Sequence, residues 1–351
     1  MTDIHFPAEW EPHSAVWSAW PSAADLWEEN LAPAREEVAL FFTAIAQPDP
    51  DVPETRGELI KVLVNGAEAR ASAETSLAEL IADKRVEIFD AGIGDIWLRD
   101  TGPLFVRKNN KLAATGFHFN GWGGKYLLGS DADMADIVAK FEGVSNNRHQ
   151  FIIEGGALET DGMGTIITTR QCLLNKNRNP GVTEKEVEMA LRETLGTEKV
   201  IWLDEGLVND HTDGHIDNIA RFLAPGVVGC MHPTGEDDPN ATVYKSIYKA
   251  LSKATDANGN RLEIVEIPSP GRITDADGEV VPASHMNFYI ANHSLIIPTY
   301  VEMEAQQAVA DEAVDLLAEA IGRPDIYAIN APAVLTGGGS FHCISQQVPQ
   351  L

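Results

Sequence analysis

Helical and strand-like patterns alternate along the whole chain, and this alternation restricts the fold more than any other feature of the sequence. Apolar residues at helical spacing predict helices over residues 34–46, 68–83, 132–142, 183–195, 240–253 and 302–321. Short apolar runs predict strands over residues 59–64, 86–89, 150–153, 199–203, 262–267 and 326–329. Thr183 and Glu186 form a capping box that supports one of the helix starts. Such an alternation predicts the α/β class.

The later helices recur roughly every 50–65 residues, each within a strand–helix–strand unit. A period of this kind is typical of structural repeats around an axis, although a doubly wound sheet also produces alternation. No glycine-rich phosphate loop follows the first predicted strand, and no Walker pattern occurs between a strand and a helix. No linker or low-complexity tract divides the chain. The pattern therefore predicts an α/β protein without deciding which α/β fold it has.

The chain is strongly acidic, because 26 Lys and Arg residues against 53 Asp and Glu residues give 26 − 53 = −27. Nucleic-acid binding needs clustered cations, so this balance argues against it. There is no apolar run long enough to predict a membrane span, and the acidic N-terminus does not predict a secretory signal. Three cysteines cannot form a disulfide framework, which favours the reducing cytoplasm. The acidity reflects either solubility alone or attraction of a cationic small molecule.

Four segments differ from ordinary structural sequence, namely residues 95–103, 153–156, 212–217 and 337–344. In the third of them, His215 and Asp217 are separated by one residue. In an extended strand, such residues point to the same face, and the apolar Ile216, Ile219 and Phe222 support a strand here. We interpret the pair as projecting into one cavity. The alternative is a surface strand with alternating polar residues.

Cys343, in the fourth segment, follows three consecutive glycines by a few residues. Glycines let backbone N–H groups and a nucleophile approach a substrate closely, which favours Cys343 as a nucleophile. The alternative is a buried structural thiol. The other two cysteines, Cys172 and Cys230, lack such a glycine run and are assigned to the core. A nucleophilic cysteine needs a base or a cationic neighbour. His215 is the best candidate, whereas His342 would point to the opposite face of a strand.

Three carboxylates, those of Asp100, Glu154 and Asp217, distinguish between kinds of cysteine chemistry. Negative charge would disrupt an oxyanion hole for ordinary amide hydrolysis. A guanidinium is instead a planar cation that carboxylates bind bidentately, and its central carbon stays open to a thiolate. The set therefore favours chemistry on a guanidine. A metal site is the alternative, but no zinc-type spacing occurs, and His211 and His215, four residues apart, fit a strand better than a helix.

Several motifs follow one another in a fixed order nearly from end to end: PAEWEPH at 7–13, then Trp17, Trp20 and Pro21, WLRDTGP at 97–103, FNGWGGKY at 119–126, EGG at 154–156, LNKNRNP at 174–180, GHID at 214–217 and GGGSFHCISQQ at 337–347. Together they resemble the agmatine deiminases, a group that also includes bacterial peptidylarginine deiminases. The resemblance implies the pentein fold, in which five strand–helix modules form a propeller around a central active site. It also implies that residues 1–351 form a single catalytic domain.

The activity implied by the resemblance is hydrolysis of agmatine to N-carbamoylputrescine and ammonia, through a covalent amidino-cysteine intermediate and without a cofactor or metal. By matching position, Cys343 is the expected nucleophile and His215 the expected acid and base. Asp100 and Asp217 are expected to hold the guanidinium. Glu154 is expected to orient and charge the histidine.

Two tryptophans and two departures from the family pattern concern substrate selection. The resemblance implies that Trp97 and Trp122 line the substrate channel, with core packing as the alternative. Related sequences often carry a second acid at the position of His211, which affects the polarity expected beside His215. Residues 121–136 are shorter and more acidic than in many agmatine deiminases, and they are expected to line the entrance.

Other functions stay open on the sequence alone. Deimination of peptidyl-arginine or free arginine shares the chemistry, and free arginine would call for a cation at the channel mouth. A cysteine amidase or peptidase is a further alternative, and so is a guanidine-binding module without catalysis, which the presence of Cys343 and His215 disfavours. The expected partner is a small cationic guanidine, with no nucleic acid and no membrane, and a homo-oligomer is left open.

Overall fold

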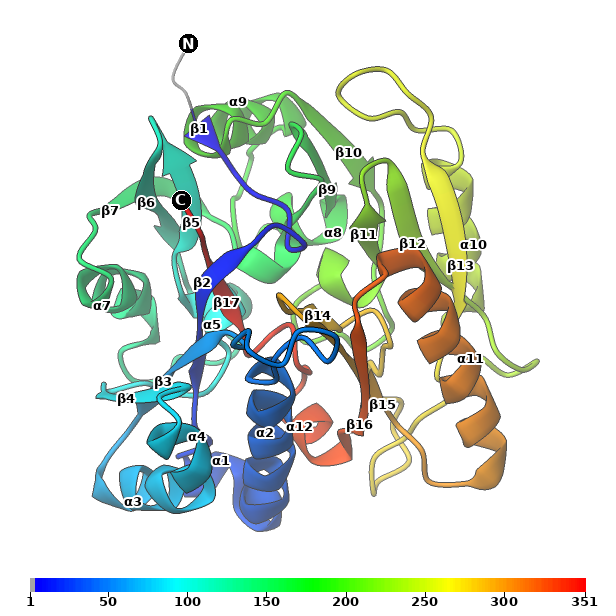
Figure 1. Ribbon diagram of the computed structural model, residues 1–351. Helices are drawn as coiled ribbons and strands as arrows, with labels where there is room; N and C mark the ends of the chain where they lie inside the picture. The colour runs from blue at the N-terminus through cyan, green and yellow to red at the C-terminus, as the bar shows by residue number, and fades with distance from the viewer. Residues whose placement is uncertain (1–3) are drawn as a thin grey trace.

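Five small β-sheets surround the middle of the molecule, and the longer helices lie mainly at its periphery (Figure 1). The computed structural model describes residues 4–351. Each sheet contains an antiparallel pair of strands, and one strand of that pair also has a parallel neighbour. A parallel neighbour requires a crossover connection, which in every sheet contains a helix. This ββαβ unit therefore defines five modules.

The strands are grouped by sheet as follows. One sheet consists of β1 (Ile4–His5), β5 (Leu104–Lys108), β6 (Lys111–His118) and β7 (Asn146–Ile152). The next two consist of β8 (Glu159–Thr160), β9 (Thr165–Thr169) and β10 (Lys199–Leu203), and of β11 (Ala220–Ala224), β12 (Val227–His232) and β13 (Glu263–Pro268). The last two consist of β14 (Tyr289–Ile290), β15 (Ser294–Thr299) and β16 (Asp325–Asn330), and of β17 (Gln346–Pro349), β2 (His13–Ala19), β3 (Leu59–Val64) and β4 (Val86–Asp90).

The helices that cover the sheets lie in the crossovers between parallel strands, and shorter helices and 3₁₀ turns complete the chain. The crossovers contain α2 (Leu31–Ile45), α3 (Ala67–Ser76), α4 (Ala78–Ala82), α7 (Met134–Phe141), α9 (Glu184–Leu195), α10 (Ala241–Leu251) and α11 (Glu304–Ile321). The short helices are α1 (Ala24–Trp27), α5 (Leu98–Thr101), α6 (Gly121–Gly124), α8 (Arg170–Leu173) and α12 (Pro332–Thr336), with 3₁₀ turns η1 (Glu28–Asn30), η2 (Asp131–Asp133), η3 (Gly155–Ala157) and η4 (Ile216–Asn218). In α10, the buried residues Tyr244, Ile247 and Leu251 form one face, as an amphipathic helix against a sheet requires.

The C-terminal strand β17 pairs with β2 near the N-terminus, with Gln346 opposite Trp17. This pairing brings the C-terminal segment back to the first module and fixes the residues that precede β17 at the centre of the molecule (Figure 1). Phe341 stacks on Phe41 of α2, with ring centroids 4.8 Å apart and an interplanar angle of 6°. This contact fixes the residues before β17 against α2. Cys343 is held between these two anchors.

The six helices and six strands predicted from apolar patterns occur close to their expected places, and the capping box of Thr183 and Glu186 is present. One predicted helix, over residues 68–83, is divided at Leu77 into α3 and α4. Neither strand of the hairpins was predicted, whether short, as β8 and β14, or long, as β6 and β15, except that the strand expected around His215 overlaps part of β11. Among residues 4–351, no helix combines the length and apolar character needed to cross a membrane.

Two local predictions are wrong. His215 is not in a strand but precedes the 3₁₀ turn η4, because Asp213 and Gly214, with φ of 64° and 88°, turn the chain just before it. Residues 341–344 also form turns rather than a strand, so the argument that His342 and Cys343 point to opposite faces does not hold. Both segments nevertheless lie where a module begins, and this position determines what their side chains meet.

Candidate active site

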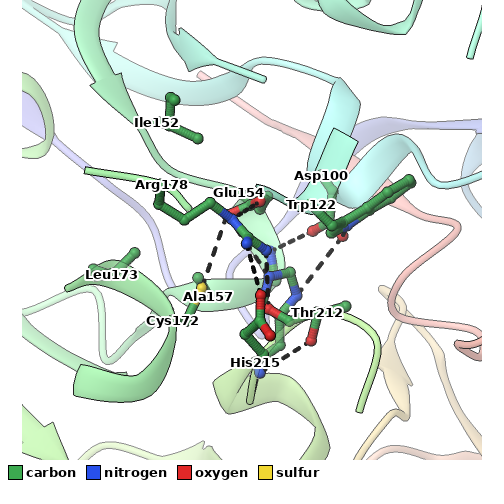
Figure 2. Close-up of polar contacts among 12 residues, drawn as sticks. Asp100, Trp122, Ile152, Glu154, Ala157, Cys172, Leu173, Arg178, Thr212 and His215 are labelled. Carbon is green, nitrogen blue, oxygen red and sulfur yellow. Dashed lines mark hydrogen bonds and ion pairs between the residues drawn. The ribbon is translucent and has the colours of Figure 1, made fainter. Parts of the chain in front are cut away.

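The predicted site residues occupy equivalent places in the fold, because each precedes the first strand of a module. Asp100 lies in α5 before β5, and Glu154 lies before β8. His215 and Asp217 lie at η4 before β11, and Cys343 lies before β17. Since the modules surround one centre, these positions bring the four predicted segments together (Figure 2 shows Asp100, Glu154 and His215).

Side chains from neighbouring modules approach the backbone of Gly156 closely. A Cβ atom at this position would lie 2.7 Å from His215 Nδ1, 2.9 Å from Asp100 Oδ1 and 3.0 Å from Asp217 Oδ2. Only glycine leaves room for these three side chains. Its backbone N–H also donates to Asp100 Oδ1 at 2.9 Å. The glycine of the EGG motif is therefore explained by convergence of the site.

The fifth module contributes Asn287, a residue that the sequence analysis missed. Asn287 precedes β14 and donates from Nδ2 to Cys343 Sγ at 3.1 Å. Its Oδ1 accepts the backbone N–H groups of His342 and Cys343, at 3.0 and 3.2 Å. The amide thus fixes the cysteine backbone and sulfur together. The hairpin that follows Asn287 was not predicted, so its place before the first strand of a module becomes visible only in the structure.

The environment of Cys343 favours the neutral thiol. The sulfur lies 3.5 Å from Asp217 Oδ2, and the side chain is buried. Burial and the charges of Asp217 and Asp100 raise the pKa of Cys343 well above its usual value, against the lowering effect of hydrogen bonds from Ser340 and Asn287. Among residues 4–351, no hydrogen bond joins this thiol to His215. A ligand cation between the carboxylates would reverse this bias.

His215 is fully buried between two carboxylates. Its Nδ1 lies 3.7 Å from Asp100 Oδ2 and its Nε2 lies 3.9 Å from Glu154 Oε2 (Figure 2). Burial by itself lowers the pKa of His215, but the Asp100 carboxylate and the contacts with Cys172 and Glu154 raise it well above the usual value. The imidazolium form is therefore favoured, and it has protons to give to a leaving group.

Arg178, also missed by the sequence analysis, fixes Glu154. Its Nε lies 2.5 Å from Glu154 Oε1, and both side chains are fully buried (Figure 2). The same guanidinium pairs with Asp213 at 2.8 Å and donates to the Thr212 carbonyl at 3.0 Å. Burial raises the pKa of Glu154, but His215 and Arg178 outweigh this effect and lower it. Glu154 thus stays ionised beside His215.

Glu154, Cys172 and His215 form the one cluster in the described residues that could hold a metal ion, with ligand atoms within 4.8 Å of one another. The residues do not fit a resident metal well. The Arg178 guanidinium already pairs with the Glu154 carboxylate, and its positive charge would repel a metal cation bound beside it. Burial and Glu154 also raise the pKa of Cys172, whereas a metal ligand must be a thiolate. Cys172 is buried, as expected for a core residue, although it borders the site.

His342 contacts the site residue Asp217, although the sequence predicted that its side chain would point to the face opposite Cys343. Its Nδ1 lies 2.8 Å from Asp217 Oδ2 and its Nε2 lies 2.9 Å from Glu9 Oε2. The ring of His342 therefore bridges the carboxylates of Asp217 and Glu9. Glu9 also pairs with Arg221 at 3.1 Å and with Arg99 at 3.3 Å. This network of buried charges determines the orientation of Asp217.

A cavity of about 170 Å³ lies beside the converged acids. Its walls include four aromatic side chains, those of Trp27, Trp97, Trp122 and Tyr126. Trp122 donates from Nε1 to Asp100 Oδ2 at 2.8 Å, so this wall reaches the site directly (Figure 2). Both tryptophans named from the sequence thus line the cavity. Of the segment 121–136, which was expected to line the entrance, Trp122, Tyr126 and Leu128 line the cavity, and Tyr126 is exposed.

The three glycines before Cys343 have a packing role. Cβ atoms at Gly337 and Gly339 would each lie 2.6 Å from the Trp97 ring, and one at Gly338 would lie 3.1 Å from the ring of His211. Larger residues would push these rings out of the cavity wall. His211 also contacts Tyr126, with its Nδ1 3.2 Å from the hydroxyl group. The glycine run therefore lets aromatic rings reach the nucleophile segment.

Comparison with known proteins agrees with this geometry. Residues 5–349 match a family described as Porphyromonas-type peptidyl-arginine deiminase. The agmatine deiminase of Stutzerimonas stutzeri (strain A1501) is 35% identical over 371 residues, covering 98% of this chain and 95% of the relative. The agmatine deiminase of Ectopseudomonas mendocina (strain ymp) is 33% identical over 370 residues, covering 99% and 95%.

Among solved structures, the agmatine deiminase of Enterococcus faecalis superposes with a TM-score of 0.87. It is 29% identical in sequence, and the match covers 99% of this chain and 96% of that one. The likeness extends over all five modules. It confirms the expected α/β pentein fold.

Proposed function

This chain belongs to the family of Porphyromonas-type peptidyl-arginine deiminases, and from this premise we propose that it is an agmatine deiminase, which hydrolyses agmatine to N-carbamoylputrescine and ammonia. The observation that carries the proposal is the convergence of a thiol, a charged histidine and three carboxylates on one buried point beside a small cavity. Because residues from all five modules meet there, we treat residues 1–351 as one catalytic domain.

The acids prepare the site for a guanidinium. Asp100 and Asp217 flank the point where the planar cation binds, and Asp217 also touches the nucleophile. The positive charge of the bound guanidinium offsets the two carboxylates that raise the pKa of Cys343. The thiol therefore loses its proton to solvent as substrate binds, since His215 is already protonated, and the thiolate forms next to the carbon that it attacks.

The reaction then proceeds in two steps. The Cys343 sulfur forms a bond to the guanidinium carbon, and the bond from that carbon to one nitrogen breaks as His215 protonates the departing ammonia. This leaves a cationic amidino group on the sulfur. A water molecule that gives its proton to His215 attacks the same carbon, the carbon–sulfur bond breaks, and the ureido product leaves. Glu154, fixed by Arg178, keeps His215 charged and in place.

The cavity favours agmatine over arginine. No Lys or Arg lines it in the described part of the chain, whereas the α-carboxylate of free arginine would require a cation. Agmatine ends in an ammonium group, which suits aromatic walls and an acid. A cavity of about 170 Å³ is also small for a peptide. The three free buried cysteines support a reducing location such as the cytoplasm.

Ammonia release on agmatine, arginine and an arginine-containing peptide tests the proposal. We expect agmatine to have the highest kcat/KM. In Cys343→Ser turnover should be lost while guanidine binding, measured by calorimetry, is kept. Acid-quenched wild-type turnover should give an adduct on the peptide that contains Cys343. Preference for the peptide would reject agmatine as substrate, and an adduct on Cys172 or Cys230 would reject the assigned nucleophile.

A further inference from the structure

A second carboxylate site lies on the cavity wall, away from the converged acids. Asp95 is 8% exposed and lines the cavity. Its Oδ1 accepts the indole N–H of Trp27 at 2.9 Å, and its Oδ2 accepts that of Trp97 at 2.8 Å. Both donors are neutral. In residues 4–351 no cation forms an ion pair with Asp95, so this buried carboxylate has no opposite charge within the chain.

The aromatic walls around Asp95 suit a cation on an apolar stem. The rings of Trp27 and Trp97 are stacked with centroids 6.2 Å apart, and Tyr126 meets Trp122 edge-on with centroids 6.0 Å apart. Aromatic faces attract ammonium groups and also pack against methylene chains. A carboxylate at the end of such a box adds a charge-assisted hydrogen bond. The lining thus matches an alkylammonium group.

Trp97 connects this carboxylate to the nucleophile. Its Nε1 donates to Asp95, while the opposite edge of its ring packs on Gly339. A Cβ at Gly339 would lie 2.6 Å from Trp97 Cζ3 and 3.1 Å from Cys343 Cβ. Asp95 and Cys343 are therefore at opposite edges of one indole. A substrate that lies along this ring has its guanidinium at Cys343 and its other end at Asp95.

We propose that Asp95, held by Trp27 and Trp97, is the specificity residue that binds the distal ammonium group of the substrate. The site selects guanidines that carry a second cation at the end of a short alkyl chain. This inference rests on the proposed agmatine deiminase function, which it makes more specific. The alternative is that Asp95 only orients the two tryptophans.

A matched pair of substrates separates these roles. n-Butylguanidine has the four-carbon chain of agmatine and its guanidinium but lacks the amine. In Asp95→Asn, kcat/KM for agmatine should fall roughly 10- to 100-fold, mainly through KM, because a hydrogen bond to a charged group is lost. For n-butylguanidine, kcat/KM should stay within about threefold. Asn keeps the acceptor for one indole N–H and loses the acceptor for the other, so the fold of this variant is checked separately.

Two further variants make the test specific. Glu302→Gln removes one charge beside the adjacent cavity and should leave the ratio of the two substrates unchanged. Trp27→Phe keeps an aromatic side chain but removes one hydrogen-bond donor to Asp95. It should alter the ratio of kcat/KM for agmatine to kcat/KM for n-butylguanidine. This variant keeps the proposal testable if circular dichroism and Tm show that Asp95→Asn does not fold.

The outcomes are distinct. A selective loss of agmatine activity in Asp95→Asn supports the proposal. An equal loss for both substrates means a structural role and overturns it, as does no loss for either. If wild-type enzyme turns over n-butylguanidine or an arginine peptide but not agmatine, the proposed function itself has failed.

Discussion

Asp217→Asn is expected to change two properties of the site in opposite directions. The Asp217 carboxylate lies 3.5 Å from the Cys343 sulfur, so its charge opposes formation of the thiolate. We propose that the same carboxylate holds the guanidinium of the substrate. Loss of its charge should therefore make the free thiol more acidic and, at the same time, make the enzyme slower.

The size of the first effect follows from the distance between the two groups. Two unit charges 4 Å apart in an effective dielectric constant of 20 interact by about 4 kcal/mol. Since about 1.4 kcal/mol corresponds to one pKa unit, the upper limit is a fall of about three units. His342, at 2.8 Å from Asp217, already offsets part of this charge. We therefore expect the pKa of Cys343 to fall by about one to two units.

Alkylation of the free enzyme measures this change. Iodoacetamide should be reacted from about pH 7 to about pH 10, with the Cys343 peptide quantified separately by mass spectrometry. At about pH 8 the rate in Asp217→Asn should rise at least roughly tenfold, while kcat/KM for agmatine falls roughly 10- to 100-fold or more. Asp100→Asn should act in the same direction but less strongly on the thiol, since Asp217 raises its pKa more.

An alkylation rate that is unchanged or lower in Asp217→Asn would refute the reasoning, because the carboxylate would then not oppose the thiolate. Glu302→Gln is the control, since its carboxylate is exposed and should affect neither measurement. A lower Tm together with loss of both activities would indicate that Asp217 is mainly structural.

Three other predictions test the parts of the site that surround the nucleophile. In Arg178→Met the buried Glu154 loses its partner, so the free energy of unfolding at neutral pH should fall by about 3–5 kcal/mol in denaturant titrations. His215 and Arg178 lower the pKa of Glu154 below its ordinary value of 4.5, so the stabilisation by the ion pair is fully present above pH 4.5. It should disappear as the pH falls through the lowered pKa of Glu154. If Arg178→Met lost as much unfolding free energy at acid pH as at neutral pH, the loss would not come from the charge of Glu154. In His342→Gln the pKa of Asp217 should rise, since His342 lowers it against the effect of burial, so the acid limb of kcat/KM should move to higher pH; a uniform loss at all pH values would mean a packing role only. If the net charge of −27 attracts the substrate, kcat/KM should fall with added salt, and more steeply for the dication agmatine than for the monocation n-butylguanidine. Rates that do not change with salt for either substrate would leave solubility as the explanation of the acidity.

The sequence predicted the main crossover helices and the strand that follows each crossover. Helix α9 was found because Thr183 and Glu186 form a capping box, and β10 was found because its apolar run is continuous. The hairpin strands β8 and β14 were not found, because two-residue strands carry no periodicity. Their pairing depends on neighbours that only the closed ring of modules supplies.

The candidate site was predicted in part for the same reason. His215 and Asp217 were placed in one cavity by a strand argument that was wrong, since the turn at Gly214 determines their direction. Arg178 and Asn287 lie in segments without periodic patterns, and their contacts join residues far apart in the chain. Such partners follow from the packing of modules rather than from spacing along the sequence.

The buried acids differ in what neutralises them, and this difference bears on the substrate. Four acids in or next to the site contact basic side chains of the chain itself: Glu154 contacts Arg178, Glu159 contacts Arg221, Glu9 contacts Arg99, Arg221 and His342, and Asp217 contacts His342. Asp100 has His215 at 3.7 Å and accepts the indole N–H of Trp122 and the backbone N–H of Gly156, whereas Asp95 accepts two indole N–H groups and has no ion pair in the described residues. These two acids lie at or beside the cavity.

A cationic substrate adds positive charge at Asp100 and at Asp95, where the described residues provide no ion pair. A neutral amide would leave Asp100 and Asp95 buried without compensation, which is costly in a site of low dielectric constant. A monocation such as n-butylguanidine would compensate the acids at the nucleophile and leave Asp95 unpaired. A short dication with its charges at opposite ends compensates both. The distribution of charge inside the cavity, more than the net charge of −27 on the whole chain, thus argues for agmatine as the substrate.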